Sequence, residues 1–181
     1  MPRLILPNQY VSVDNPLIFL AGPMRGAPLW QDKAIEIISS KNPDIYIASP
    51  SKKLRTEYIL DAIKGDDTKF SRQTNWEAHY IEYSSKNGAV IVWLPAQVFP
   101  MPINKRTGFP KPYARDTRGE YGELRGSMKY DKNIRFVVGY EENFDGWDVA
   151  KENFLRVSPN ISFYSTLEDT CEEAVRLANL K

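Results

Sequence analysis

The sequence predicts a single α/β domain over residues 1–181, built as a doubly wound, mainly parallel sheet of five strands with helices on both faces. Two observations favour this fold. Short apolar runs alternate along the chain with segments whose apolar residues recur at helical spacing. The run at 89–94 contains no polar residue, which is typical of a parallel strand that helices cover on both faces.

The first half of the chain is expected to form a strand, a helix and a second strand. Residues 17–20 are an apolar run that ends in the small-residue turn Ala21-Gly22-Pro23. Apolar side chains then recur at helical spacing from Trp30 to Ile38, and Asn42-Pro43 ends this helix before the apolar run 45–48. A further short helix is expected near 57–63.

The second half continues the alternation of helices and strands. Helices are expected at 72–86, 119–130 and 148–157, and strands at 89–94, 135–138 and 161–164. Ser165 and Glu168 have the spacing of a capping box, so a last amphipathic helix is expected to begin there. Such an alternation is typical of flavodoxin-like and Rossmann-like sheets, which bind ligands at the carboxyl ends of their central strands.

A proline-rich loop is predicted at about 95–118, directly after the strand that we expect to be central. Five prolines between positions 95 and 112 disfavour regular structure, because proline lacks an N–H and fixes φ. Loops of this length are uncommon in compact domains and usually have a function. We therefore expect the loop to border the ligand site and to be more mobile than the sheet when no ligand is bound.

Composition and charge exclude several classes of function. The chain has 24 basic and 23 acidic residues, so it has no overall field that would attract a nucleic-acid polymer or a membrane surface. Its apolar runs are too short to span a bilayer, and its first residues lack the pattern of a signal peptide. Cys171 is the only cysteine, which excludes an internal disulfide and favours a reducing, cytoplasmic setting.

Two segments contain candidate site residues. The turn Ala21-Gly22-Pro23-Met24, followed by Arg25, allows the backbone to approach a ligand closely. The segment from Asp116 to Glu123 joins the long loop to the next helix, which places its carboxylates at the mouth of the predicted sheet. Carboxylates at a helix start also stabilise the helix dipole, so position alone does not separate a structural from a functional role.

Three phrases in this order resemble a known family. They are Ile18-Phe-Leu-Ala-Gly-Pro23, Trp76-Glu77 and Arg118-Gly-Glu120-Tyr-Gly-Glu123. Together they resemble the nucleoside 2-deoxyribosyltransferase-like family over residues 17–140, with this chain as a divergent member. The resemblance implies an enzyme that cleaves an N-glycosidic bond and transfers a (deoxy)ribosyl group between nucleobases through a covalent glutamyl–sugar intermediate.

The resemblance also implies roles for individual residues. Glu120-Tyr121-Gly122 matches the family's Glu-x-Gly phrase, so Glu120 is the expected nucleophile, whereas Glu123 has no glycine two positions later. The aspartate that the family carries six residues before its nucleophile is replaced here by Ala114, and Asp116 is the candidate for its work. Arg118 is a candidate for binding a phosphate or orienting the glutamate, and Arg25 is a second candidate for binding a phosphate.

Other residues are weaker candidates for contacts with the substrate. Glu77 lies near the place where the family carries an acidic residue that contacts the base, and it is also a candidate proton donor. Trp93 can stack on a base, although core packing is the favoured interpretation of this residue. The same stacking role is open to three aromatic residues of the loop, Phe99, Phe109 and Tyr113. His79, the only histidine, is interpreted as an ordinary packing residue.

The resemblance implies a reaction that requires no metal and no organic cofactor. Its ligands are a nucleoside or nucleotide and a free nucleobase, and family members commonly assemble as homo-oligomers. Two alternatives are kept: an N-glycoside hydrolase of the same fold, and a non-catalytic module that senses nucleotides. The identity of the base, the identity of the sugar and the need for a 5′-phosphate are open at this point.

Overall fold

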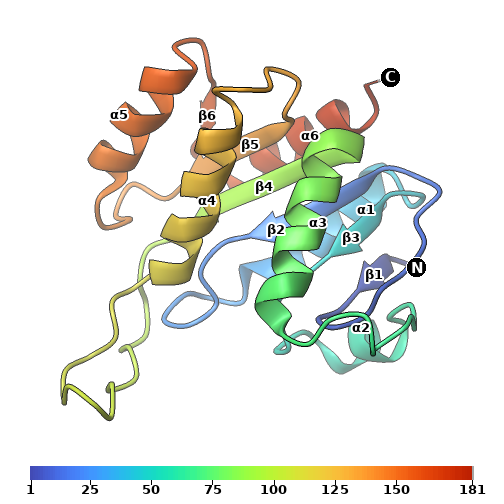
Figure 1. Ribbon diagram of the computed structural model, residues 1–181, viewed down its shortest axis with the longest axis horizontal. Coiled ribbons are helices and arrows are strands. Elements are labelled where there is room, and N and C mark those ends of the chain that lie inside the picture. The colour runs from blue at the N-terminus through green and yellow to red at the C-terminus, as the bar shows by residue number, and fades with distance from the viewer. Residues whose placement is uncertain (181) are drawn as a thin grey trace.

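The computed structural model describes residues 1–180 and contains one sheet of six strands (Figure 1). Every neighbouring pair is parallel, and the order across the sheet is β1-β3-β2-β4-β5-β6. The predicted fold class is confirmed, with one strand more than expected. The strands are β1 (Arg3–Ile5), β2 (Leu17–Ala21), β3 (Tyr46–Ala48), β4 (Gly88–Leu94), β5 (Phe136–Tyr140) and β6 (Phe163–Tyr164).

Helices cover both faces of the sheet. Figure 1 shows α3 and α4 in front of the sheet and α1 and α6 behind it, with α5 beside α4. The ring of Phe154 in α5 packs against Tyr121 of α4 and Phe136 of β5, which places α5 on the same face as α4. The helices are α1 (Trp30–Lys41), α2 (Thr56–Leu60), α3 (Gln73–Asn87), α4 (Arg115–Ser127), α5 (Trp147–Val157) and α6 (Leu167–Ala178).

The centre of the sheet is formed by β2 and β4, whose residues are all buried. From β2 the chain moves outward to β3 on one side, and from β4 it moves outward to β5 and β6 on the other. The order of strands therefore reverses between β2 and β4. In sheets of this kind the loops that leave two such strands separate and form a crevice at their carboxyl ends, which is the usual ligand site.

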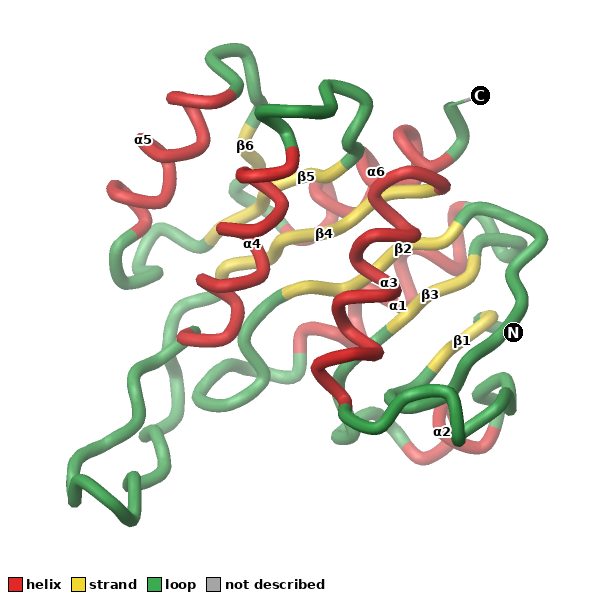
Figure 2. Tube along the Cα trace, in the orientation of Figure 1, coloured by secondary structure: helices red, strands yellow, loops and turns green. Residues whose placement is uncertain are grey.

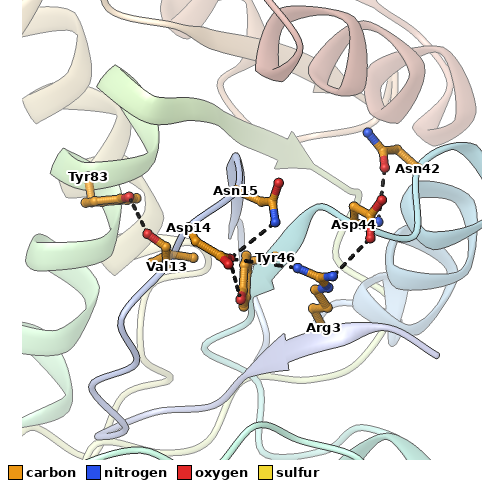
Figure 3. A network of polar contacts seen from close by, with 8 residues as sticks. All are labelled: Arg3, Val13, Asp14, Asn15, Asn42, Asp44, Tyr46 and Tyr83. Atoms are coloured by element: carbon orange, nitrogen blue, oxygen red, sulfur yellow. Dashed lines mark hydrogen bonds and ion pairs between the residues drawn. The ribbon is translucent and has the colours of Figure 1, made fainter.

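The sixth strand, β1, was not predicted from the sequence. It has only three residues and pairs with β3 at the edge of the sheet. Polar contacts fix this edge (Figure 3): Arg3 donates to Asp44 at 3.0 Å, and the hydroxyl of Tyr46 donates to Asp14 at 2.9 Å. The second bond holds the pKa of the Asp14 carboxyl below its usual range. These partners are far from β1 in the sequence, so no local pattern indicates the strand.

The predicted loop is shorter than expected and partly ordered into a hairpin. It ends at Ala114, and α4 begins at Arg115 instead of residue 119. The last proline is Pro112, so nothing in the sequence prevents a helix from residue 115 onward. We call residues 95–114 the arm. Ile103 and Pro110 form an antiparallel bridge within it, and Figure 2 shows the arm extending away from the body of the protein.

The remaining boundaries agree with the predictions to within a few residues. The last helix is capped by Thr166, whose hydroxyl accepts from the backbone N–H of Asp169 at 3.1 Å, so the cap lies one residue after the predicted Ser165. The last strand has two residues instead of the predicted four. Within residues 1–180, no helix combines the length and the apolar character needed to cross a membrane.

Candidate active site

A cavity of about 600 Å³ opens at the carboxyl ends of β2 and β4. Its wall is formed by the loop after β2, the start and middle of α3, the base of the arm and the first turns of α4. This position is the one expected from the strand order. The lining residues used below are Gly22, Pro23, Met24, Arg25, Pro50, Gln73, Glu77, Met101, Lys111, Ala114, Arg115, Asp116, Glu120 and Glu123.

The loop after β2 is held tightly against the core. A Cβ atom at Gly22 would lie 2.5 Å from the carbonyl oxygen of Trp93 and 2.6 Å from the ring of Trp30, so only glycine fits at this position. The indole N–H of Trp30 donates to the carbonyl of Pro23 at 3.1 Å and so fixes the backbone at Pro23, directly after Gly22. The cavity wall formed by Gly22, Pro23 and Met24 is therefore rigid backbone.

The arm is joined to this first loop at Gly26. The carbonyl of Gly26 accepts from the backbone N–H groups of Val98 at 2.7 Å and Phe99 at 3.0 Å. Gly26 has φ of 80°, and a side chain there would meet Met101 and the ring of Tyr113. The two loops that border the cavity thus form one connected rim.

Glu120 lies in the second turn of α4 and faces the cavity. Tyr121 and Leu124 are buried and anchor the opposite side of the helix in the core. Residues three and four positions apart share a helix face, so Glu120 and Glu123 follow Asp116 along the cavity side. The helix therefore presents three carboxylates in a row.

The carboxylate of Glu120 is in an unusual environment. Its Oε2 atom is inaccessible to solvent and has no hydrogen-bond partner among the described residues. Burial, together with the charges of Glu77, Asp116 and Glu123, raises the pKa of this carboxyl to about 8. Perturbed groups of this kind in a cleft are candidates for functional residues.

Glu77 approaches the same cavity from α3. The side-chain amide of Gln73 donates to its Oε1 at 2.8 Å and to the carbonyl of Pro50 at 3.3 Å, which fixes the carboxylate relative to the end of β3. Burial raises the pKa of Glu77, and the charge of Asp116 adds to this effect, whereas the bond from Gln73 opposes it. Two carboxyl groups with raised pKa values thus face one cavity from two helices.

Six of the nine predicted site residues line the cavity together: Gly22, Pro23, Met24, Glu77, Asp116 and Glu120. Asp116 does so from the first turn of α4 and not from the loop, because the helix begins earlier than expected. Its side chain is exposed and pairs with Arg115 at 3.1 Å. Glu123 also lines the cavity, but it is exposed.

Three predicted site residues do not line the cavity. Ala21 is fully buried within β2. Trp93 is 3% exposed, and its ring packs over Gly139 of β5, on the face covered by Thr170 of α6, so it lies on the far side of the sheet from α3 and α4. Arg118 points to the other side of α4, where it donates to the carbonyl of Asp145 at 2.6 Å.

The other aromatic candidates also have structural surroundings. The buried hydroxyl of Tyr113 donates to the carbonyl of Pro95 at 2.8 Å and closes the base of the arm. Phe99 and Phe109 are exposed and do not line the cavity. His79 packs among the rings of Tyr10, Phe70 and Tyr80, as interpreted from the sequence.

Sequence reasoning missed several residues of the cavity wall, among them Gln73, Lys111 and Arg115. No motif contains them, and only the packing of the arm and of α3 brings them to the site. The described residues contain no group of three or more histidine, cysteine or acidic side chains placed to hold a metal ion. Comparison with protein-family models and with curated proteins finds no match for this chain.

Proposed function

We propose that the protein cleaves the N-glycosidic bond of a nucleoside-type substrate and transfers the sugar to a second nucleobase, with Glu120 as the nucleophile. The observation that carries this proposal is the buried, unpartnered Oε2 of Glu120 in the cavity at the ends of β2 and β4. A buried polar atom without a partner destabilises a fold by about 1–3 kcal/mol. Its retention here favours a role in chemistry on a bound ligand.

The size of the cavity supports a small-molecule substrate. Ligand sites for small molecules usually have volumes of about 300–1,000 Å³. The cavity has about 600 Å³, which accommodates a nucleoside with its base and sugar. The sequence resemblance to the nucleoside 2-deoxyribosyltransferase-like family adds the reaction type and the Glu-x-Gly phrase at Glu120.

The proposed reaction has two steps. A carboxylate oxygen of Glu120 attacks C1′ and forms a C–O bond, while the C1′–N bond breaks and its electron pair leaves with the base nitrogen. Glu77 supplies a proton to the departing base. In the second step a nitrogen of the acceptor base attacks C1′, the ester bond to Glu120 breaks, and the proton of the acceptor returns to Glu77.

The charge environment fits a division of roles between two carboxyl groups. The charge of Glu77 is one of the causes that raise the pKa of Glu120, so the two groups titrate as a pair. The pair holds one proton, which lies on Glu120 in the resting protein, and its transfer to Glu77 gives the reactive form, with Glu120 ionised for attack and Glu77 protonated for donation. This is the general pattern in which neighbouring carboxyl groups act as base and acid at the same pH.

Glu120 is preferred to Glu123 as the nucleophile. Both line the cavity, but Glu123 is exposed, whereas Oε2 of Glu120 is removed from solvent. A desolvated carboxylate is the more reactive nucleophile toward a developing oxocarbenium ion.

We place the reaction in the cytoplasm, where a buried free thiol such as Cys171 stays reduced.

The test is an activity assay on folded variants. Wild-type protein is incubated with a panel of nucleosides and nucleotides, with and without a free acceptor base, and products are separated by chromatography. Glu120→Gln and Glu120→Ala are expected to lose cleavage, and Glu123→Gln is the matched control that retains it, with circular dichroism as the check on folding. An active Glu120→Gln beside an inactive Glu123→Gln shows that the nucleophile assignment is wrong.

The same assay separates the two alternative functions. Release of base at a rate that does not depend on the acceptor indicates hydrolysis in place of transfer. Nucleotide binding without turnover in the wild type indicates a sensing module, and in that case Glu120→Gln changes no rate.

A further inference from the structure

We propose that the substrate of this site carries a phosphate group, which is bound at the cavity rim by Arg25, Lys111 and Arg115. This inference rests on the proposed function, because it specifies a nucleoside monophosphate as the class of substrate. It keeps Arg25 from the expectation drawn from the sequence but not Arg118, which is bound to Asp145 outside the cavity.

The three cations come from three separate parts of the chain. Arg25 belongs to the loop after β2, Lys111 to the arm and Arg115 to the first position of α4, and all three line the cavity. The junction at Gly26 connects them. Gly26 directly follows Arg25 and contacts the arm, and the backbone N–H of Lys111 donates to the carbonyl of Pro102 at 3.0 Å, next to Met101 in that junction.

Two of these charges have no carboxylate partner, since neither Arg25 nor Lys111 forms an ion pair with any described residue. The third cation, Arg115, pairs only with Asp116. Arg115 uses its Nε atom to bond Asp116 at 3.1 Å, and its two terminal nitrogens make no hydrogen bond within residues 1–180. Several N–H donors at the rim are therefore free to bind an anion.

The distribution of charge in the cavity matches a phosphorylated sugar. Glu77 and Glu120 would repel an anion, and Asp116 is paired with Arg115, so we expect the phosphate to bind to Arg25, Lys111 and the free nitrogens of Arg115 and away from C1′. Arginine and lysine supply the charge-assisted hydrogen bonds that phosphate oxygens prefer. A neutral nucleoside has no group that uses these donors.

The start of α4 adds to the positive end of the cavity. Its N-cap is Ala114, in the left-handed region at φ 53°, and no side chain caps the helix. The N–H groups of the first turn therefore lie uncapped at the cavity wall, where they favour an anion. Together with the three cations, they fix the end of the cavity at which a 5′-phosphate fits.

The first test compares kcat/KM for a nucleoside and for its 5′-monophosphate. In the wild type we expect the monophosphate to be preferred by at least about tenfold, which is about 1.4 kcal/mol. Lys111→Ala and Arg25→Ala are each expected to lower the ratio of the two kcat/KM values by about 10- to 100-fold. Lys105→Ala is the matched control, since it removes a lysine of the same arm that does not line the cavity.

The second test measures binding without turnover. The Glu120→Gln protein is titrated with ribose 5-phosphate, 2-deoxyribose 5-phosphate, the unphosphorylated sugars and inorganic phosphate. We expect one of the sugar phosphates to bind at least tenfold more tightly than its sugar and than inorganic phosphate, and Lys111→Ala in the same background to remove this difference. Inorganic phosphate that binds as tightly as the sugar phosphates overturns the assignment to a nucleotide.

The two tests separate this inference from the proposed function. If the nucleoside is cleaved as well as the monophosphate, and Lys111→Ala leaves their ratio unchanged, the phosphate site is wrong and glycosidic cleavage stands. If a sugar phosphate binds through Lys111 but no nucleoside or nucleotide is cleaved, the phosphate site stands and the proposed function is wrong.

Discussion

The stability of Glu120→Gln relative to the wild type should increase as the pH rises. The unfolded chain ionises this carboxyl at its ordinary pKa of about 4.5, whereas in the folded protein burial raises the pKa to about 8. The folded state thus keeps a proton that the unfolded state has released. The contribution of this group to stability is fully present below pH 4.5 and is lost as the pH rises through 8.

The magnitude follows from the difference between the two pKa values. Each pKa unit corresponds to about 1.36 kcal/mol of free energy. Between pH 5.5 and pH 8 the wild type should lose about 3 kcal/mol of its free energy of unfolding through this carboxyl alone. Glutamine does not titrate, so it avoids this loss. Its buried amide leaves a constant, pH-independent penalty of about 1–3 kcal/mol.

The assay is thermal unfolding followed by circular dichroism at pH 5.5, 7 and 8 and constant ionic strength. A domain of this size changes its Tm by about 2–4 °C for each kcal/mol, so the difference in Tm between Glu120→Gln and the wild type should grow by about 6–12 °C over this range. Glu123→Gln, at an exposed position on the same helix, is the control and should show a much smaller change with pH, because its charge is the smallest of the named causes of the raised Glu120 pKa. A Glu120→Gln difference that is equal at pH 5.5 and pH 8 would refute the reasoning.

Three further predictions concern the pair of carboxyl groups, the fit of two glycines and the arm. The kcat/KM of the wild type should fall as the pH rises through about 8, because the pair Glu77 and Glu120 then loses its single proton. Glu77→Gln should abolish this fall, which a pH profile of kcat/KM for both proteins checks. Gly22→Ala should destabilise the fold by about 1–3 kcal/mol through its contact with Trp93, whereas Gly122→Ala, which meets nothing within 4 Å, should stabilise it by about 0.5–1 kcal/mol in chemical denaturation. Hydrogen exchange of the arm should slow when substrate binds, and equal protection with and without substrate contradicts a lid.

The central strands could be predicted from the sequence because their burial is complete. Every side chain of β4 is covered on both faces, so the strand is apolar throughout and is visible without any partner. The edge strand β1 could not be predicted in this way. Its three residues depend on Tyr46 and Asp44, which reach Arg3 only in the folded chain.

The candidate site was predictable where a local phrase carries it. Glu120 and the turn at Gly22 were identified from their own segments, and the structure brings both to one cavity. Core packing was the favoured interpretation of Trp93 and is confirmed. The face of the sheet that it covers could not be predicted, because strand residues alternate between faces and a fully buried strand does not indicate which face is which. Lys111 reaches the cavity only through the fold of the arm, for which the sequence contains no periodic signal.

The structure also corrects the geometry of the acidic segment. The predicted loop placed Asp116 and Arg118 before the helix, but both belong to the first turn of α4. Helical spacing then separates them, since Asp116 shares the cavity side with Glu120 while Arg118 turns toward Asp145 and the ring of Phe144. The boundary of one helix thus decides which of the two side chains lines the cavity.

The covalent intermediate on Glu120 is the most direct test of this account. Wild-type protein is mixed with a substrate identified in the activity panel, quenched in acid within the first turnover and measured by intact-protein mass spectrometry, followed by peptide mapping. We predict an increase in mass equal to one glycosyl group, located on the peptide that contains Glu120, present in Glu123→Gln and absent in Glu120→Gln. Turnover by the wild type without any adduct, together with turnover by Glu120→Gln, would contradict the account.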